Sequence, residues 1–229
     1  MIGIVIFREN VMRRAIICFT RVPKPGVTKT RLLPVLSGDQ CAQLHTAFLK
    51  DLSGVYSQMD ADLYAAYTPD PDWEMLRGIF PHARGFFPQE GGDLGEKMYH
   101  ALRQVLELGY DAAVLTGADL PRMTKAHLES GFAALTHADI TLGPTSDGGY
   151  WLVGMKQPHR AVFEKQQYGG ATVLENTVAA AKAAGLTVSF AKTCDDVDTP
   201  EDLAALAGKL SPESATNRYL KQEGFCLDQ

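Results

Sequence analysis

The sequence lacks the cysteine and charge patterns that mark several protein classes. It has 229 residues and four cysteines, with no Cys-x-x-Cys pair among Cys18, Cys41, Cys194 and Cys226. This spacing argues against a zinc ribbon or a disulfide framework, so we expect reduced thiols. There is no block of like charge, and 27 acidic against 22 basic residues give a net charge of -5. A polybasic nucleic-acid surface is therefore not expected.

Long apolar runs are also missing. No stretch approaches the roughly 20 apolar residues needed to cross a bilayer, so we expect no membrane partner and a cytoplasmic location. The apolar residues 1–7 are followed by Arg8 and by Arg13 and Arg14 instead of a small-residue cleavage site, which argues against a signal peptide. Because Met12 precedes the first convincing strand, our hypothesis is that residues 1–11 are a dispensable extension.

Strand and helix patterns alternate along the chain. Continuous or β-branched apolar runs predict strands at 15–20, 62–67, 85–87, 112–116, 139–142, 150–153 and 186–191. Apolar positions at helical spacing and capping residues predict helices from about 39, 73, 94, 125, 173 and 200, with Thr172 and Glu175 as a capping box. This order predicts one α/β domain over residues 1–229, three-layered with a mostly parallel sheet, and ligands at the carboxyl ends of its strands.

The loop after the first strand, from Arg21 to Arg31, carries a phosphate-binding pattern. Gly26 allows a ligand to approach the backbone closely, and Lys29 and Arg31 offer an ammonium and a forked guanidinium that suit phosphate oxygens. A solvated basic loop is the alternative. The spacing fits neither a Walker A loop nor a Gly-x-Gly-x-x-Gly dinucleotide loop.

Carboxylates follow two other strands. Asp119 stands directly after the strand at 112–116, and hard oxygen ligands there suit Mg²⁺ or Mn²⁺, with an ordinary turn aspartate as the alternative. Asp198 ends the last strand and forms a second acidic point, whereas Asp202 is interpreted as a helix-capping acid. The six histidines have no metal-ligand spacing and are interpreted as surface or packing residues.

Two glycine-containing loops complete the candidate site. Residues 91–95 form a flexible rim at a helix start, which could admit a base or ribose or serve only as a helix cap. Asp147, Gly148 and Gly149 combine a carboxylate with close backbone approach and could lie beside an acceptor, although a plain hairpin turn explains them nearly as well.

Five ordered motifs, at 19–32, 93–98, 116–121, 143–150 and 196–203, resemble a bacterial family of transferases. The resemblance covers nearly the whole chain from residue 14. It implies the GT-A, or nucleotide-diphospho-sugar transferase, fold and a relation to molybdenum-cofactor guanylyltransferase and phospholactate guanylyltransferase.

The resemblance also implies roles for individual residues. Lys29 and Arg31 would hold the phosphates of a nucleotide, and Asp119 and Asp198 would ligate Mg²⁺ or Mn²⁺. Two further residues, Leu94 and Gly95, would border the base. The chain departs from the family pattern at two places. Arg21 and Lys24 make the charge of the first loop atypical. At the central strand, Asp119 supplies only one of the two acids of an Asp-x-Asp signature.

The expected activity is metal-dependent nucleotidyl transfer from a nucleoside triphosphate to a phosphorylated small-molecule acceptor, with release of pyrophosphate. In that reaction Lys29, Arg31 and Asp119 would stabilise charge at the scissile phosphate, and no protein nucleophile is needed. Glycosyl transfer from a nucleotide sugar is the alternative, and a nucleotide-sugar-binding protein without turnover is the third. The base, the acceptor and the oligomeric state stay open at this point.

Overall fold

A seven-stranded sheet, in the order β3-β2-β1-β4-β6-β5-β7, runs through the computed structural model, which describes residues 12–206 and 208–225. The proposed extension at 1–11 and Cys226 lie outside the described residues. Neighbouring strands are parallel except where β6 pairs with β4 and β5, to which it is antiparallel. The strands are β1 (Arg14–Thr20), β2 (Asp62–Tyr67), β3 (Gly85–Pro88), β4 (Ala112–Thr116), β5 (Ile140–Pro144), β6 (Tyr150–Met155) and β7 (Val188–Phe190).

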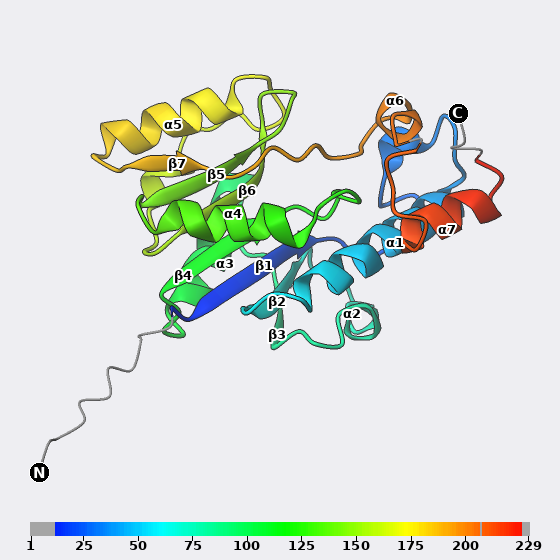
Figure 1. The fold of residues 1–229 in the computed structure, drawn as a ribbon, viewed down its shortest axis with the longest axis horizontal. Helices are drawn as coiled ribbons and strands as arrows, with labels where there is room; N and C mark the ends of the chain where they lie inside the picture. The colour runs from blue at the N-terminus through cyan, green and yellow to red at the C-terminus, as the bar shows by residue number, and fades with distance from the viewer. Residues whose placement is uncertain (1–11, 207, 226–229) are drawn as a thin grey trace, which may run out of the picture.

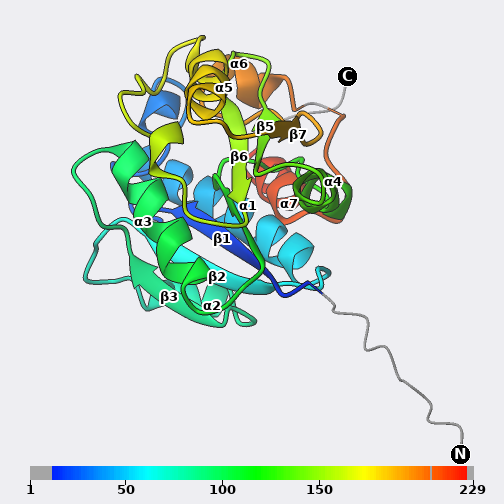
Figure 2. The same cartoon turned by 90° about the vertical axis from the view of Figure 1, so that its left-hand side faces the viewer.

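Helices cover both faces of this sheet, which confirms the three-layer α/β/α prediction (Figures 1 and 2). On one face, α1 and α4 pack against the sheet through residues such as Leu52 and Phe132. On the other face, α3 and α5 do so through residues such as Leu102 and Ala181. Within the described residues, no helix is long and apolar enough to cross a membrane. The helices are α1 (Gly38–Tyr56), α2 (Met75–Ile79), α3 (Leu94–Leu106), α4 (Lys125–Leu135), α5 (Val173–Ala183), α6 (Pro200–Ala204) and α7 (Ala215–Gln222).

Capping residues set most helix starts as the sequence predicts. Asp93 accepts a hydrogen bond from the Glu96 amide at the start of α3, and Thr199 and Asp202 form a capping box that opens α6. The predicted capping box at Thr172 is wrong. Thr172 has a ψ of 7° instead of the extended backbone of an N-cap residue, and its hydroxyl makes no capping hydrogen bond.

The C-terminal helices pack on the start of α1, beyond the carboxyl end of the sheet (Figure 1). Leu203 and Leu220 join Leu44 and Phe48 of α1 in a separate apolar cluster. The Asp51 carboxylate of α1 accepts hydrogen bonds from two amides in the first turn of α7. This packing brings the segment that precedes α6 over the loop that follows β1.

The sheet order changes direction at β1 and β4, which lie side by side and parallel. The chain moves from β1 outward through β2 and β3, then returns to the other side of β1 with β4. Loops that leave the carboxyl ends of two such strands diverge to opposite sides. In open α/β sheets this switch point is where ligands bind.

Candidate functional site

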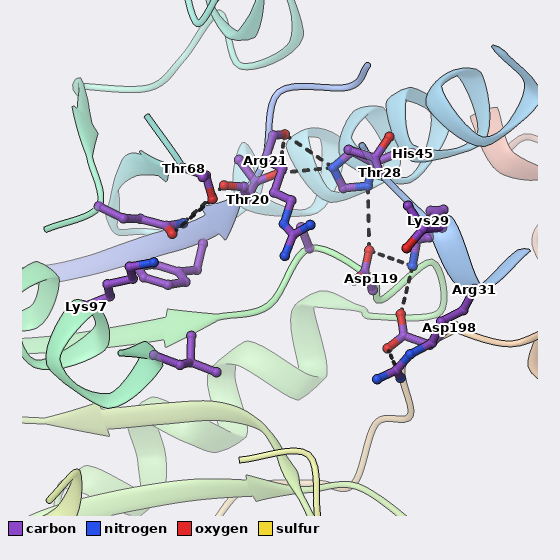
Figure 3. Close-up of a pocket in the computed structure, with 15 residues that line it drawn as sticks. Thr20, Arg21, Thr28, Lys29, Arg31, His45, Thr68, Lys97, Asp119 and Asp198 are labelled. Carbon is purple, nitrogen blue, oxygen red and sulfur yellow. Dashed lines mark hydrogen bonds and ion pairs between the residues drawn. The ribbon is translucent and has the colours of Figure 1, made fainter. Parts of the chain in front are cut away.

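A cavity of about 580 Å³ lies at this switch point. Five of the predicted site residues line it together: Lys29, Arg31, Leu94, Asp119 and Asp198. They come from the loop after β1, from α3, from the loop after β4 and from the segment before α6. Figure 3 shows Lys29, Arg31, Asp119 and Asp198 close together at one side of the cavity. The tertiary fold thus joins segments that are up to 169 residues apart in the chain.

The Lys29 ammonium lies between the two acidic residues. Its Nζ atom is 2.6 Å from Oδ1 of Asp119 and 3.3 Å from Oδ1 of Asp198, and it donates a hydrogen bond to the Val197 carbonyl. The side chain is 2% exposed and its ammonium lies 4.9 Å from the centre of the Phe48 ring. Lys29 is therefore engaged by protein oxygens at the wall of the cavity.

The backbone of this loop is shaped to aim Lys29 inward. Lys29 has a φ of 54°, a left-handed conformation that costs a residue with a side chain about 1 to 2 kcal/mol. Its carbonyl accepts a hydrogen bond from the Cys41 thiol of α1, which ties the strained turn to the core. Gly26 also has a positive φ, of 70°, with open space where a Cβ would stand. This conformation turns the loop, and the close approach of a ligand to Gly26 stays a prediction.

Asp119 presents one oxygen to the protein and the other to the cavity. Oδ1 is buried and makes no aligned hydrogen bond, although it is ion-paired with Lys29, whereas the side chain as a whole is 37% exposed. Burial disfavours the charged carboxylate, but the Lys29 ammonium and the His45 ring outweigh it and hold the pKa of Asp119 below its ordinary value. Asp119 is therefore ionised at neutral pH.

His45, which the sequence interpretation treats as an ordinary packing residue, lies beside this pair. It projects from α1 with its Nδ1 3.6 Å from Oδ1 of Asp119 and its Nε2 3.2 Å from the Thr20 hydroxyl (Figure 3). Nδ1 is buried without a hydrogen-bond partner. One signal in the sequence was available, because His45 stands on the apolar face of its helix, four residues after Cys41.

Arg31 stands at the rim of the cavity. Its side chain is 69% exposed and its Nη1 lies 3.3 Å from Oδ2 of Asp198. Unlike the buried Lys29 ammonium, this guanidinium is open to the solvent. It can meet a ligand without a large rearrangement of the loop.

The opposite wall of the cavity is built by Gln89, Leu94 and α3. The Gln89 amide donates to the carbonyls of Thr20 and Ala66, so it links the ends of β1 and β2. Leu94 is 43% exposed at the rim, where an apolar surface can face a base. Gly95 is buried, and a Cβ there would come 2.7 Å from the Phe163 carbonyl, so it allows α3 to pack closely.

The predicted acceptor-side residues lie in a neighbouring hollow of about 280 Å³, which Asp147 shares with Asp196. Asp147 accepts hydrogen bonds from the Thr145 hydroxyl and the Gly149 amide and so closes a turn, as the hairpin alternative describes. A Cβ at Gly148 would lie 1.9 Å from the Ala171 carbonyl, so this position requires glycine. Burial and the nearby Asp198 and Asp147 charges raise the pKa of Asp196 to about 6.

Relatives of known structure share this architecture. A nucleotide-diphospho-sugar transferase from Desulfovibrio desulfuricans, whose name is itself provisional, is 32% identical with a TM-score of 0.86 over 93% of this chain and 96% of its own. A cytidylyltransferase from Leptospira borgpetersenii, 14% identical, shares the fold with a TM-score of 0.52 over 95% of this chain and 98% of its own. The GT-A-type fold expected from the sequence is therefore confirmed.

Sequence relatives point the same way. The phosphoenolpyruvate guanylyltransferase of Sphaerobacter thermophilus is 27% identical over 196 residues, which cover 82% of this chain and 90% of that protein. Together with the structural relatives it confirms the expectation of a transferase. Residues 52–170 match a family model described as "uncharacterized protein conserved in bacteria (DUF2064)". The chain belongs to this family of GT-A-like proteins.

Proposed function

We propose that the protein transfers a nucleotidyl group from a nucleoside triphosphate to a phosphorylated small-molecule acceptor. The observation that carries this proposal is that Asp119 and Asp198 meet at the Lys29 ammonium in the wall of a cavity lined by four cationic side chains, Lys29 among them. Such a cavity can receive a polyphosphate and hold its charge in place. The guanylyltransferase relative makes GTP and phosphoenolpyruvate the first pair of substrates to test.

In this reaction an oxygen of the acceptor phosphate attacks the α-phosphorus of the triphosphate. A new phosphorus–oxygen bond forms, the bond from the α-phosphorus to the bridging oxygen breaks, and pyrophosphate leaves with both electrons of that bond. Positioning and fixed charge supply most of the acceleration in phosphoryl-transfer chemistry, so no protein nucleophile is required.

The donor set of the cavity fits a divalent cation. Asp119 and Asp198 are hard oxygen ligands that both contact the Lys29 ammonium, and both carboxylate side chains are partly exposed at the cavity, so oxygens not held by Lys29 can meet a cation there. In the described residues no cluster of three or more acidic, histidine or cysteine side chains suited to a metal occurs, so substrate phosphates and water would complete the shell. Bound Mg²⁺ or Mn²⁺ would screen the phosphate charges.

Other residues have supporting roles in this proposal. Arg31, at the rim, contacts a phosphate, while Lys29 adds fixed positive charge from behind the carboxylates. Leu94 provides an apolar contact to the base, and Gly95 allows α3 to pack closely against the Phe163 carbonyl with Leu94 at the rim. The turn at Asp147, with Gly148 and Gly149, orients the acceptor from the neighbouring hollow.

We propose that residues 1–229 form one domain and that the protein works in the cytoplasm. Cys18, Cys41 and Cys194 are free and buried, as expected in a reducing compartment. Burial raises the pKa of the Cys18 thiol to about 12, so this thiol is inert at neutral pH.

Glycosyl transfer is the second candidate, because the 32% identical relative carries the name of a nucleotide-diphospho-sugar transferase. In that reaction the same cavity would stabilise a departing nucleoside diphosphate. The loop after β4 supplies a single acid, Asp119, where an Asp-x-Asp signature has two. This favours nucleotidyl transfer.

The products separate the two reactions. The protein is incubated with Mg²⁺ and each labelled nucleoside triphosphate, first with phosphoenolpyruvate and then with a pool of phosphorylated metabolites, and pyrophosphate is measured. A parallel series uses nucleotide sugars, and Asp119→Asn is the control for contaminating activity. Acceptor-dependent pyrophosphate release is expected. If the protein instead forms nucleoside diphosphate, and only from nucleotide sugars, the proposed function is wrong and the protein is a glycosyltransferase.

A further inference from the structure

The charges of the main cavity are divided between two ends. We define the paired end as Lys29, Arg31, Asp119 and Asp198, whose two cations are ion-paired with its two carboxylates. We define the basic end as Arg21 and Lys97, the other two cations that line the cavity. In Figure 3, Arg21 points into the hollow between Lys97 on one side and Asp119 on the other. The net positive charge of the cavity therefore lies at the basic end.

Arg21 lines the cavity with most of its donors unpaired in the described residues. It follows β1 directly, and Nη1 donates one hydrogen bond to the Val27 carbonyl at 3.3 Å. Among the described residues no carboxylate lies within ion-pair distance of its guanidinium. A guanidinium has five N–H donors in a fork that matches phosphate oxygens, so four of them are left without a hydrogen-bond partner in the described residues.

Lys97 is likewise free of its acidic neighbours on α3. The Glu96 carboxylate accepts from the Gly92 amide and pairs with Arg160 at 3.2 Å. The Asp93 carboxylate caps the helix by accepting from the Glu96 amide. In the part of the chain that the structure describes, the Lys97 amide donates to the Asp93 carbonyl within the helix, and its side-chain ammonium has no hydrogen bond or ion pair. Its ammonium therefore adds an uncompensated charge to the cavity wall.

We propose that Arg21 and Lys97 form a phosphate subsite of this cavity, and that Lys29 instead neutralises the charge of the two carboxylates with which it is ion-paired. This inference rests on the proposed function, since it assigns the anionic part of its substrates. Two uncompensated cations that face one hollow are stabilised by an anion between them. Lys29 would reach a phosphate only by leaving three protein oxygens, whereas in the described residues the Arg21 side chain contacts one carbonyl oxygen, that of Val27, and the Lys97 ammonium contacts none.

Binding of inorganic tripolyphosphate, measured by calorimetry at fixed ionic strength, tests the subsite without any turnover. Arg21→Gln and Lys97→Met should each weaken it by roughly ten-fold to a hundred-fold, as expected for a charge-assisted contact, and Arg21→Lys should restore part of the loss. Arg103→Gln, which removes a charge from α3 outside the cavity, is the matched control and should have no effect. Unchanged affinity in both Arg21→Gln and Lys97→Met, with a large loss in Lys29→Met, would overturn the proposal.

Two further titrations identify which phosphate uses the subsite. If it holds the donor, Arg21→Gln and Lys97→Met weaken GTP much more than guanosine. If it holds the acceptor, they weaken phosphoenolpyruvate and leave the difference between GTP and guanosine intact. Either result supports the subsite. Failure of the proposed function is a separate outcome, in which these binding losses occur but no nucleotide substrate yields pyrophosphate.

Discussion

The two ends of the cavity hold the same kinds of cation in different states. At the paired end, Lys29 is 2% exposed and surrounded by oxygens from segments that lie far away in the sequence. At the basic end, Arg21 and Lys97 line the same hollow without a carboxylate partner in the described residues. A basic residue after a buried strand is therefore not by itself a ligand contact. Its pairing with neighbouring acids decides whether its charge is available.

The two ends therefore have different proposed roles in ligand binding. A cation held between two carboxylates favours their charged forms and keeps them close together. A bound polyanion without that cation would disfavour the same charged forms. Uncompensated cations can attract and orient that polyanion. The predictions below test this division, beginning with the largest effect.

The largest loss is expected from Asp119→Asn, which breaks the paired end. It removes the carboxylate that lies 2.6 Å from Lys29 and that is our proposed metal ligand. Turnover should fall by roughly a hundred-fold or more, in the range seen when a preorganised charge-stabilising group is lost. Binding of Mn²⁺, followed by electron paramagnetic resonance, should weaken in parallel. Unaltered metal binding in this variant would refute the assignment of Asp119.

Lys29→Met tests whether the paired end also stabilises the fold. Removing a buried cation from between two carboxylates should cost about 2 kcal/mol, less than for a fully buried pair because both carboxylates are partly exposed. At this chain length that corresponds to a fall in Tm of roughly 4 to 8 °C.

The pH dependence of this loss follows from the pKa of Asp119. Because Lys29 and His45 hold it below the ordinary value, the stabilisation is present above about pH 4, the pKa of an unfolded aspartate, and is lost as the pH falls below that. The difference in Tm between wild type and Lys29→Met should therefore shrink in acid. A constant difference from pH 3 to pH 7 would mean that the ammonium acts only by packing.

Arg31→Ala tests whether an ion-paired cation of the paired end can also contact a phosphate, because the Arg31 side chain is paired with Asp198 and yet 69% exposed. We expect roughly ten-fold weaker binding of GTP, with guanosine unchanged, since one charge-assisted contact is removed. An equal loss for guanosine would indicate general damage to the loop.

The smallest effect is expected from Asp196→Asn, in the neighbouring hollow. Burial and neighbouring charges raise the pKa of Asp196 to about 6, so ionisation destabilises the folded state as the pH rises from about 4 to 6. Removing the charge should raise Tm at pH 7.5 by a few degrees, about 2 to 4 °C per kcal/mol, and leave it unchanged at pH 4. A gain at both pH values would contradict this explanation.

Much of the fold could be predicted because its signals are local. The strand from Arg14 to Thr20 is apolar on both faces, and Asp93 and Thr199 combine a capping side chain with a helical pattern directly after it. Thr172 shows the limit of this reasoning, because a capping hydroxyl also needs an extended backbone. Helix α7 was not predicted, and it is held against α1 by Asp51, a contact that no local pattern contains.

By itself, the sequence determined the alternation of strands and helices, the class of the sheet and the residue types at its strand ends, because these depend on side-chain periodicity and on backbone preferences over a few residues. Only the tertiary structure decided which charges meet. The switch point between β1 and β4, together with α6 and α7 packed on α1, brings Asp119 and Asp198 to Lys29 and leaves Arg21 and Lys97 without a carboxylate partner in the described residues. Ion pairing depends on distance in space, and the spacing of residues along a chain does not record it.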